Sequence, residues 1–201
     1  MIRIVIAEDQ ALVSGALAAL LRFEPDMDVI SLVKNGQEAL EVCQKENPDI
    51  MLTDIEMPVM TGLELAASIA EQKLPCKVIM LTTFARAGYL RRATASGVRG
   101  YMLKDSPSDS LAAAIRTVQS GGRVIAPELA LEGWNGPHDP LCERERQVLR
   151  LAGSGAGNAE IARLIHLSEG TVRNYLSDAI GKLNVKNRVE AFRIASDAGW
   201  L

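Results

Sequence analysis

Three carboxylates follow two short apolar segments of the chain, at the point where each segment ends. Glu8 and Asp9 come directly after residues 2–7, and Asp54 follows residues 50–53. If both segments are parallel strands, their carboxyl ends meet at one edge of a sheet and the three carboxylates converge there. Hard cations such as Mg²⁺ prefer oxygen ligands and keep water or phosphate in the remaining positions. The sequence therefore predicts a divalent-cation pocket in which a carboxylate could accept a phosphoryl group.

Two further apolar segments end in a hydroxyl and an ammonium. Thr82 ends the run that begins at Val78, and Lys104 follows residues 98–103. Both groups could hold the oxygens of a phosphoryl group. Each of these residues alone could be a polar group that solubilises a strand end or shapes a turn. Their shared position at the ends of apolar runs favours a joint site.

The elements that must position these residues alternate between short apolar runs and helical patterns. Strands are predicted at 2–7, 29–33, 49–53, 78–82 and 98–103, and helices at about 11–23, 35–46, 62–72, 86–97 and 107–120. Ser106 is the predicted N-cap of the last helix, with Pro107 as its first residue. This alternation predicts an α/β fold, a flavodoxin-like (βα)5 domain with strand order 2-1-3-4-5 and a crevice at the carboxyl ends of the first and third strands.

The rest of the chain has a different pattern. Glycine and proline punctuate residues 123–140, which we interpret as a linker between domains at 1–122 and 141–201. Whether Leu129, Leu131 and Trp134 in this linker pack on a domain is left open by the sequence. Beyond it, the apolar residues recur with helical period. Four short helices are predicted at about 143–153, 158–165, 169–183 and 187–198, an all-α domain.

One of these helices, at 169–183, has one apolar stripe and turns Arg173, Asn174 and Ser177 outward. Such side chains suit base edges and phosphates in the DNA major groove. Residues 163–193 hold six Lys or Arg against three Asp or Glu, whereas the whole chain has a net charge of −3. This modest basic excess indicates, without proving, a nucleic-acid partner.

Composition excludes several other classes. The 201 residues are 48% hydrophobic, which is enough for two small cores, and no stretch approaches the roughly 18 apolar residues that span a bilayer. The N-terminus lacks a signal-peptide pattern, so we expect a cytoplasmic protein. Three cysteines and two histidines are scattered without metal-ligand spacing.

Several fragments, in this order and spacing, resemble bacterial two-component response regulators of the NarL/FixJ family, in which a receiver domain is joined to a LuxR-type helix-turn-helix. The fragments are AEDQ at 7–10, TDIEMPVMTG at 53–62, LTTF at 81–84, GYMLKD at 100–105, ERERQVLRL at 143–151 and the stretch at 158–191. A DesR-like subgroup is suggested by TTFARAGY at 82–89, LKDSPS at 103–108, GTVRNY at 170–175 and GWL at 199–201. The resemblance covers nearly the whole chain.

The resemblance implies a role for each residue of the predicted pocket. Asp54 would be the phosphoacceptor, and Mg²⁺ would be bound by Glu8, Asp9, Asp54 and the backbone carbonyl of Glu56. Thr82 and Lys104 would sense the phosphoryl oxygens, and Tyr101 is similar to the aromatic switch residue of receivers. The implied partners are a sensor histidine kinase and double-stranded promoter DNA. The chain would not be an enzyme, because it takes the phosphoryl group onto its own aspartate.

In the second domain, the resemblance and the helix pattern together assign DNA contacts. Arg173, Asn174 and Ser177 would read bases, and Lys182, Lys186, Asn187 and Arg188 would hold phosphates. The chain departs from the family pattern at three positions: Asp105 replaces a common proline, Cys142 replaces a threonine that caps the first helix, and Tyr175 replaces a common histidine. Loss of that threonine cap would cost about 1 kcal/mol.

The predicted helix at 11–23 is apolar almost all round. Its core stripe is predicted to be Val13, Leu17 and Leu20, which leaves other small apolar residues to face elsewhere. The predicted face of a phosphorylation-dependent homodimer consists of Leu12, Ala16 and Ala19 from this helix, with Ala112 and Ala113 from the helix at 107–120. The alternative is that alanine is present only because it favours helix formation.

Two other functions are compatible with part of this pattern. Phosphatases of the haloacid dehalogenase type also form an aspartyl phosphate, but they carry an aspartate two residues after the nucleophile, where this chain has Glu56. They also have no need for a helix-turn-helix. The second alternative is a DNA-binding dimer that is never phosphorylated, and the complete acidic set of the predicted pocket argues against it.

Overall fold

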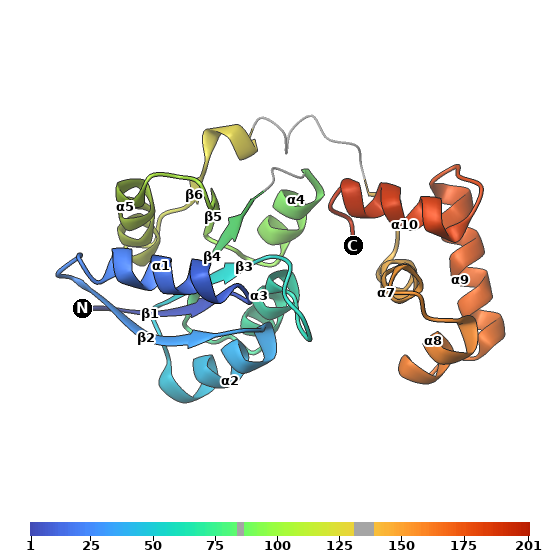
Figure 1. Cartoon of the computed structure of the whole chain (residues 1–201), viewed down its shortest axis with the longest axis horizontal. Coiled ribbons are helices and arrows are strands. Elements are labelled where there is room, and N and C mark those ends of the chain that lie inside the picture. The colour runs from blue at the N-terminus through green and yellow to red at the C-terminus, as the bar shows by residue number, and fades with distance from the viewer. Residues whose placement is uncertain (84–86, 131–138) are drawn as a thin grey trace. The chain divides into compact units, whose positions relative to one another are not determined.

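The computed structural model describes residues 1–83, 87–130 and 139–201. The chain forms two compact units, one drawn mainly from residues 1–130 and the other mainly from residues 139–201 (Figure 1). Among the described residues, none of the helices has both the length and the apolar character needed to cross a membrane.

A parallel sheet with the order β2-β1-β3-β4-β5-β6 forms the centre of the first unit, as far as the described residues show. Its strands are β1 (Ile2–Ala7), β2 (Met27–Val33), β3 (Ile50–Asp54), β4 (Lys77–Thr82), β5 (Gly100–Leu103) and β6 (Val124–Ile125). The central strands are nearly continuous runs of Ile, Val, Leu and Met because both faces of the sheet are covered. The predicted order of the first five strands is confirmed.

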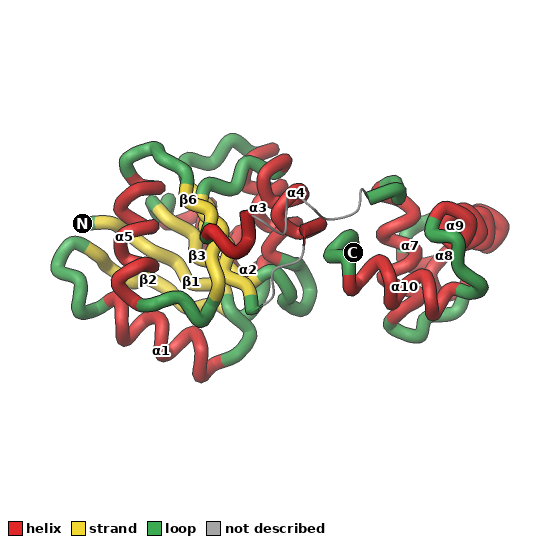
Figure 2. The backbone as a smooth tube through the Cα atoms, turned by 90° about the horizontal axis from the view of Figure 1, so that it is seen from above, coloured by secondary structure: helices red, strands yellow, loops and turns green. Residues whose placement is uncertain are grey.

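Helices cover both faces of this sheet (Figure 2). They are α1 (Ala11–Leu21), α2 (Gly36–Glu46), α3 (Gly62–Glu71), α4 (Ala87–Ala95) and α5 (Ser108–Gln119). The apolar residues of α1 and α5 pack with Ile4 and Ile6 in one core cluster. Those of α2, α3 and α4 pack with Val5 and Met51 in a second cluster on the other face. Alternate residues of β1 therefore serve the two layers.

Local capping explains where these helices begin. Thr61 and Glu64 form a capping box at the start of α3, and Asn35 caps α2 by accepting the Glu38 N–H. The prediction that Ser106 caps α5 was off by one residue. Pro107 occupies the N-cap position with φ −54°, and the helix starts at Ser108.

The segment predicted as the start of a linker is partly structured. Val124 and Ile125 pair with Gly100 and Tyr101 as β6, a sixth strand that the sequence analysis did not predict. Leu129 is only 2% exposed and belongs to the core cluster of Val5 and Met51. It therefore packs on the first unit, whereas Leu131 and Trp134 lie outside the described residues. A two-residue strand is too short to show an alternating pattern.

In residues 139–201 the structure shows the four helices that were predicted, with bounds shifted by a few residues at most. They are α7 (Glu143–Gly153), α8 (Asn158–Leu164), α9 (Glu169–Lys182) and α10 (Arg188–Asp197). Their core includes Val148, Leu149, Val172, Leu176 and Trp200. Ser168 caps α9 by accepting the Thr171 N–H, which fixes the start of the helix that was predicted to face DNA.

Candidate functional site

The three predicted carboxylates meet at the carboxyl ends of β1 and β3. Glu8, Asp9 and Asp54 each offer an oxygen, and these oxygens lie within 4.8 Å of one another. Glu8 and Asp54 are buried, whereas Asp9 is exposed. Three carboxylate oxygens with one open side fit a hard divalent cation that keeps several waters. The donor set is therefore suited to Mg²⁺.

Lys104 lies between two of these carboxylates. Its Nζ is 2.6 Å from Oε2 of Glu8 and 2.9 Å from Oδ2 of Asp54. Its backbone N–H donates to the carbonyl of Thr82 over 2.8 Å, so the ends of β4 and β5 are joined at the site. Thr82 is itself buried. The structure thus brings together the five pocket residues that the sequence placed at separate strand ends.

Burial dominates the electrostatics of this pocket. It raises the pKa of Glu8 and of Asp54, because removal from water disfavours the carboxylate, and the hydrogen bonds from Lys104 only partly offset this. Burial also opposes the charge of Lys104, but its hydrogen bonds to Glu8 and Asp54 raise the pKa of the ammonium. With all four groups ionised, three carboxylates and one ammonium leave the pocket negative. An added cation would relieve this repulsion.

The loop after β3 holds Asp54 tightly. Oδ1 of Asp54 accepts the Ile55 N–H over 2.7 Å. Gly62 donates its N–H to the Ile55 carbonyl over 2.9 Å, and a Cβ at Gly62 would lie 2.0 Å from the Asp54 carbonyl oxygen. Between them, Val59 has a φ of 68°, a left-handed conformation that is strained for a β-branched residue. This close packing leaves Asp54 little freedom to move.

Glu56 has a side-chain partner that sequence reasoning missed. The hydroxyl of Tyr89, on α4, donates to Oε1 of Glu56 over 2.7 Å. The only signal for Tyr89 in the sequence was its place in the fragment at 82–89, which carried no role. Tyr101, the predicted switch residue, is 2% exposed and packs in the core cluster with Tyr89. The predicted metal-binding role of the Glu56 carbonyl stays a prediction.

The surface of α1 and α5 agrees only in part with the prediction. Leu12, Ala16, Ala19 and Ala113 are exposed. Ala112 is 2% exposed and packs in the core cluster of α1 and α5. Its burial leaves almost no surface for the dimer face to which it was assigned. Leu20, which was predicted to be in the core, is 44% exposed. Leu17 is buried as predicted and Val13 packs partly buried against the same cluster, whereas Ser14, Ala18 and Leu21 occupy the other core positions of α1.

The predicted DNA-contacting residues fall into two groups. Arg173, Asn174, Ser177 and Lys186 have exposed side chains. The remaining three have partners within the protein. Asn187 accepts the N–H groups of Val189 and Glu190 as the cap of α10, Arg188 donates to the Ala156 carbonyl over 3.3 Å, and Lys182 pairs with Glu145. These partners could not be predicted from the sequence.

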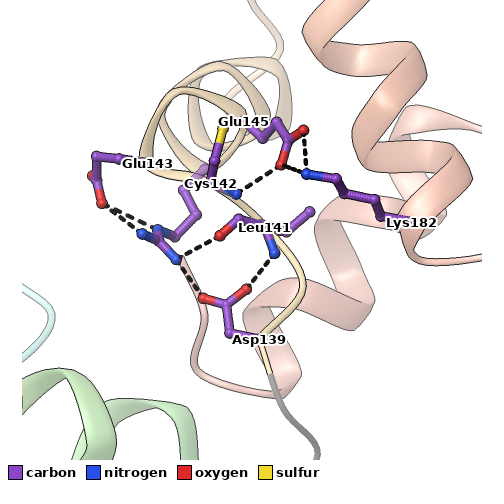
Figure 3. A network of polar contacts seen from close by, with 7 residues as sticks. Asp139, Leu141, Cys142, Glu143, Glu145 and Lys182 are labelled. Atoms are coloured by element: carbon purple, nitrogen blue, oxygen red, sulfur yellow. Dashed lines mark hydrogen bonds and ion pairs between the residues drawn. The ribbon is translucent and has the colours of Figure 1, made fainter.

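A network of polar contacts surrounds the start of α7 (Figure 3). Oε2 of Glu145 accepts the Cys142 N–H over 2.7 Å, so α7 keeps a cap even though Cys142 replaces the expected threonine. Arg146 bonds Asp139, the Leu141 carbonyl and Glu143. The bond to the Cys142 N–H is the half of a capping box that Glu145 supplies. The predicted loss of about 1 kcal/mol concerns the other half, which a threonine hydroxyl would supply, and it stays a prediction.

Two family models match separate parts of the chain. The first, the response regulator receiver domain, matches residues 4–116. The second, bacterial regulatory proteins of the luxR family, matches residues 139–195. The chain belongs to the response regulators. This confirms the predicted family and the predicted DNA-binding, transcription-regulating function, and neither alternative function is favoured.

Two relatives and one solved structure align with the whole chain. The transcriptional regulatory protein DesR of Bacillus subtilis (strain 168) is 48% identical over 200 residues, which cover 100% of this chain and 99% of DesR. The uncharacterized transcriptional regulatory protein YvfU of the same strain is 49% identical over 201 residues, covering 100% of both chains. The crystal structure of ChrA, a response regulator in a heme-sensing two-component system, has a TM-score of 0.59 and 29% identity, covering 100% of this chain and 98% of ChrA.

Proposed function

We propose that this response regulator accepts a phosphoryl group on Asp54 from the phosphohistidine of a sensor histidine kinase, and that the phosphorylated chain dimerises and binds promoter DNA. The observation that carries the proposal is the pocket itself. Glu8, Asp9 and Asp54 converge within 4.8 Å. Lys104 contacts Glu8 and Asp54 at 2.6 and 2.9 Å. In this scheme the receiver occupies residues 1–122 and the DNA-binding domain residues 141–201.

The side chains of Glu8, Asp9 and Asp54, with the Glu56 carbonyl, would hold Mg²⁺. When bound, the cation would neutralise charge on the phosphoryl oxygens. A carboxylate oxygen of Asp54 attacks phosphorus, the P–N bond of the phosphohistidine breaks, and its electron pair stays with the imidazole. The Ile55 N–H orients Asp54 by donating to its other oxygen over 2.7 Å.

The switch begins with a change of partners for Lys104. The phosphorylated Asp54 has more negative charge and more acceptor oxygens than the free carboxylate. Lys104 therefore leaves Glu8 and Asp54 Oδ2 for a phosphoryl oxygen, and the Thr82 hydroxyl turns toward another. Because the Lys104 N–H is bonded to the Thr82 carbonyl, the two strand ends move together. Tyr101 is buried in the same strand as Leu103, and it repacks when the strand ends move.

The output is a two-fold dimer built on α1 and α5, with Leu12, Ala16, Ala19 and Ala113 at the contact. Such a dimer would present two α9 helices to half-sites about 34 Å apart, one turn of DNA. Arg173, Asn174 and Ser177 would read base edges, because their side chains are exposed on one helix. Lys186 and Arg188 would contact phosphates.

Phosphorylation by acetyl phosphate in the presence of Mg²⁺ tests this function. We expect the chain to gain the mass of one phosphoryl group and to shift toward a dimer in sizing experiments, whereas Asp54→Ala gains neither. Asp28→Ala, which removes an exposed carboxylate on β2, serves as the matched control and should behave as the parent chain. A full mass gain in Asp54→Ala would show that another residue is the acceptor. A gain without any change in self-association or DNA affinity would contradict the switch.

A further inference from the structure

Lys182, in the last turn of α9, forms an ion pair with a carboxylate of another helix. Its Nζ is 2.7 Å from Oε1 and 2.8 Å from Oε2 of Glu145, in the first turn of α7. The Glu145 side chain is 4% exposed, whereas that of Lys182 is 42% exposed. The ion pair therefore consists of a buried carboxylate and a lysine that reaches it from the surface of α9.

The same carboxylate also fixes the start of α7. Oε2 of Glu145 accepts the Cys142 N–H over 2.7 Å while both oxygens face Lys182 (Figure 3). One buried side chain thus joins the N-terminus of α7 to the C-terminal turn of α9. Further along the two helices, the contact is apolar and includes Val148 and Leu149 of α7 with Leu176 and Ala179 of α9. Apolar packing alone is non-directional, so the ion pair adds a defined register between the helices.

The pair is charged at neutral pH. The hydrogen bond to Glu145 raises the pKa of Lys182. Burial opposes ionisation of Glu145, but the hydrogen bonds from Lys182 and from the Cys142 N–H outweigh it, so the pKa of Glu145 is lowered. If Lys182 turned to a DNA phosphate, Glu145 would remain as a buried carboxylate without its counter-ion. Breaking this pair would cost Glu145 its hydrogen bonds to an ammonium, whereas one exposed phosphate contact is a modest, salt-screened interaction.

We propose that Lys182 is a positioning residue for DNA reading and not a phosphate contact: held by Glu145, it sets the orientation of α9 from which Arg173 and Asn174 meet base edges. This rests on the proposed role of α9 in DNA recognition. Lys186, four residues further on, provides the contrast. Its side chain is exposed, and the ion pairs that the structure shows among the described residues do not involve it.

The test compares Lys182→Gln with Lys186→Gln in the full chain. The DNA probes are a duplex selected in vitro from a random library by the parent chain and a scrambled duplex of the same composition. Binding is measured over a range of salt concentrations. Lys186→Gln should reduce the slope of log K against log salt by about 0.9 on both duplexes and leave their affinity ratio unchanged. Lys182→Gln should keep the parent slope, while the ratio falls about tenfold, the equivalent of one base-pair contact.

A double variant guards against simple misfolding. Glu145→Gln with Lys182→Gln leaves no buried charge unpaired, and its slope should also equal that of the parent chain. In this double variant the amide oxygen at position 145 can still accept the Cys142 N–H, so it should regain part of the selectivity between the two duplexes that Lys182→Gln loses, which a loss of fold would not allow. A slope lowered by about 0.9 in either Lys182→Gln protein, with the affinity ratio intact, would overturn the inference while leaving DNA binding in place. If the parent chain showed no salt-dependent binding, both this inference and the proposed DNA-binding function would be overturned.

Discussion

At the scale of single residues, Lys104 determines the charge balance of the phosphoacceptor pocket. It contacts Glu8 and Asp54 at 2.6 and 2.9 Å, so it partly neutralises the pocket in the unphosphorylated chain. In the proposed function the same ammonium would bind a phosphoryl oxygen. One lysine would then serve both states, so the phosphorylated state would need no new cation from the protein, only a change of partners for Lys104.

From the lowered pKa of Glu145 we predict that the stability of the second unit depends on pH. The folded-state pKa of Glu145 is lower than the ordinary value of 4.5 because the bonds from Lys182 and Cys142 outweigh burial. The ionised form therefore stabilises the fold above that value, and this stabilisation is lost as the pH falls through the folded-state pKa. We expect the free energy of unfolding to decline in that acidic window, and to decline less in Glu145→Gln.

Urea unfolding followed by the fluorescence of Trp200, which is buried in the core of this unit, would measure the effect. The chain has a second tryptophan, so both proteins would carry Trp134→Phe. At neutral pH, Glu145→Gln should be less stable by about 1.5–3 kcal/mol, the range for a hydrogen bond to a charged group. Identical slopes against pH in the two proteins would show that another group controls the acid response.

The residues of the pocket could be predicted because their chemistry and their position coincide. Glu8, Asp54 and Thr82 are polar residues that end or follow otherwise apolar strands, and parallel strands bring such ends together. The partners of Tyr89 and Lys182 could not be predicted. They lie 33 and 37 residues away in the sequence, and no periodic pattern connects a side chain to a partner in another element.

At the scale of elements, α1 shows where pattern reasoning fails. Nearly every residue of this helix is apolar, so the sequence holds no contrast between a core face and a surface face. The prediction therefore placed Leu20 in the core, whereas Leu21 occupies that position. The run of alanines in α5 caused the same error at Ala112. By contrast, α9 mixes charged and apolar residues, and Arg173 and Asn174 were assigned correctly to its exposed side.

The junction of β3 and α3 allows a prediction about close packing. A Cβ at Gly62 would lie 2.0 Å from the carbonyl oxygen of Asp54, which is backbone and cannot turn aside. We expect Gly62→Ala to destabilise the first unit by about 1–3 kcal/mol, the usual cost of overpacking. It should also slow phosphorylation by acetyl phosphate, because the acceptor itself must shift. Urea unfolding and the rate of mass gain would measure the two effects.

Gly15→Ala is the matched control for this substitution. Gly15 is exposed on α1, and a Cβ there would meet no heavy atom within 4 Å. Alanine favours the helix over glycine by up to about 1 kcal/mol, so this variant should be slightly more stable than the parent chain. If both glycine variants changed stability by the same amount, backbone entropy would account for Gly62 and the close contact would not.

At the scale of the whole molecule, the signal must pass between two units whose cores are separate. The apolar clusters of the first unit contain no residue beyond Leu129, and the cluster of the second unit begins at Leu141, as far as the described residues show. In the proposed function, a dimer of the first unit would link phosphorylation at Asp54 to DNA binding by α9 without a shared core, because it would raise the effective concentration of the second units at paired DNA sites.

Leu12 provides the test of that coupling. It is 86% exposed on α1, so its replacement should cost the single chain little stability. In a two-fold dimer each copy carries the change, and Leu12→Arg would both remove apolar contact and bring two like charges together near the axis. We expect the phosphorylated variant to self-associate at least about tenfold more weakly, a loss of roughly 1.4 kcal/mol, and to bind paired half-sites more weakly in proportion. The rate of mass gain from acetyl phosphate should stay that of the parent chain.

Sedimentation of the phosphorylated protein over a range of concentrations would measure this loss. Val189→Arg is the control, since Val189 is also an exposed apolar residue (70%) but lies on α10 of the second unit. It should leave self-association unchanged. If Leu12→Arg dimerised as tightly as the parent chain, the contact would have to lie on another face. If it stayed monomeric yet kept full affinity for paired half-sites, phosphorylation would have to reach α9 within a single chain, and effective concentration could not be the link between the two units.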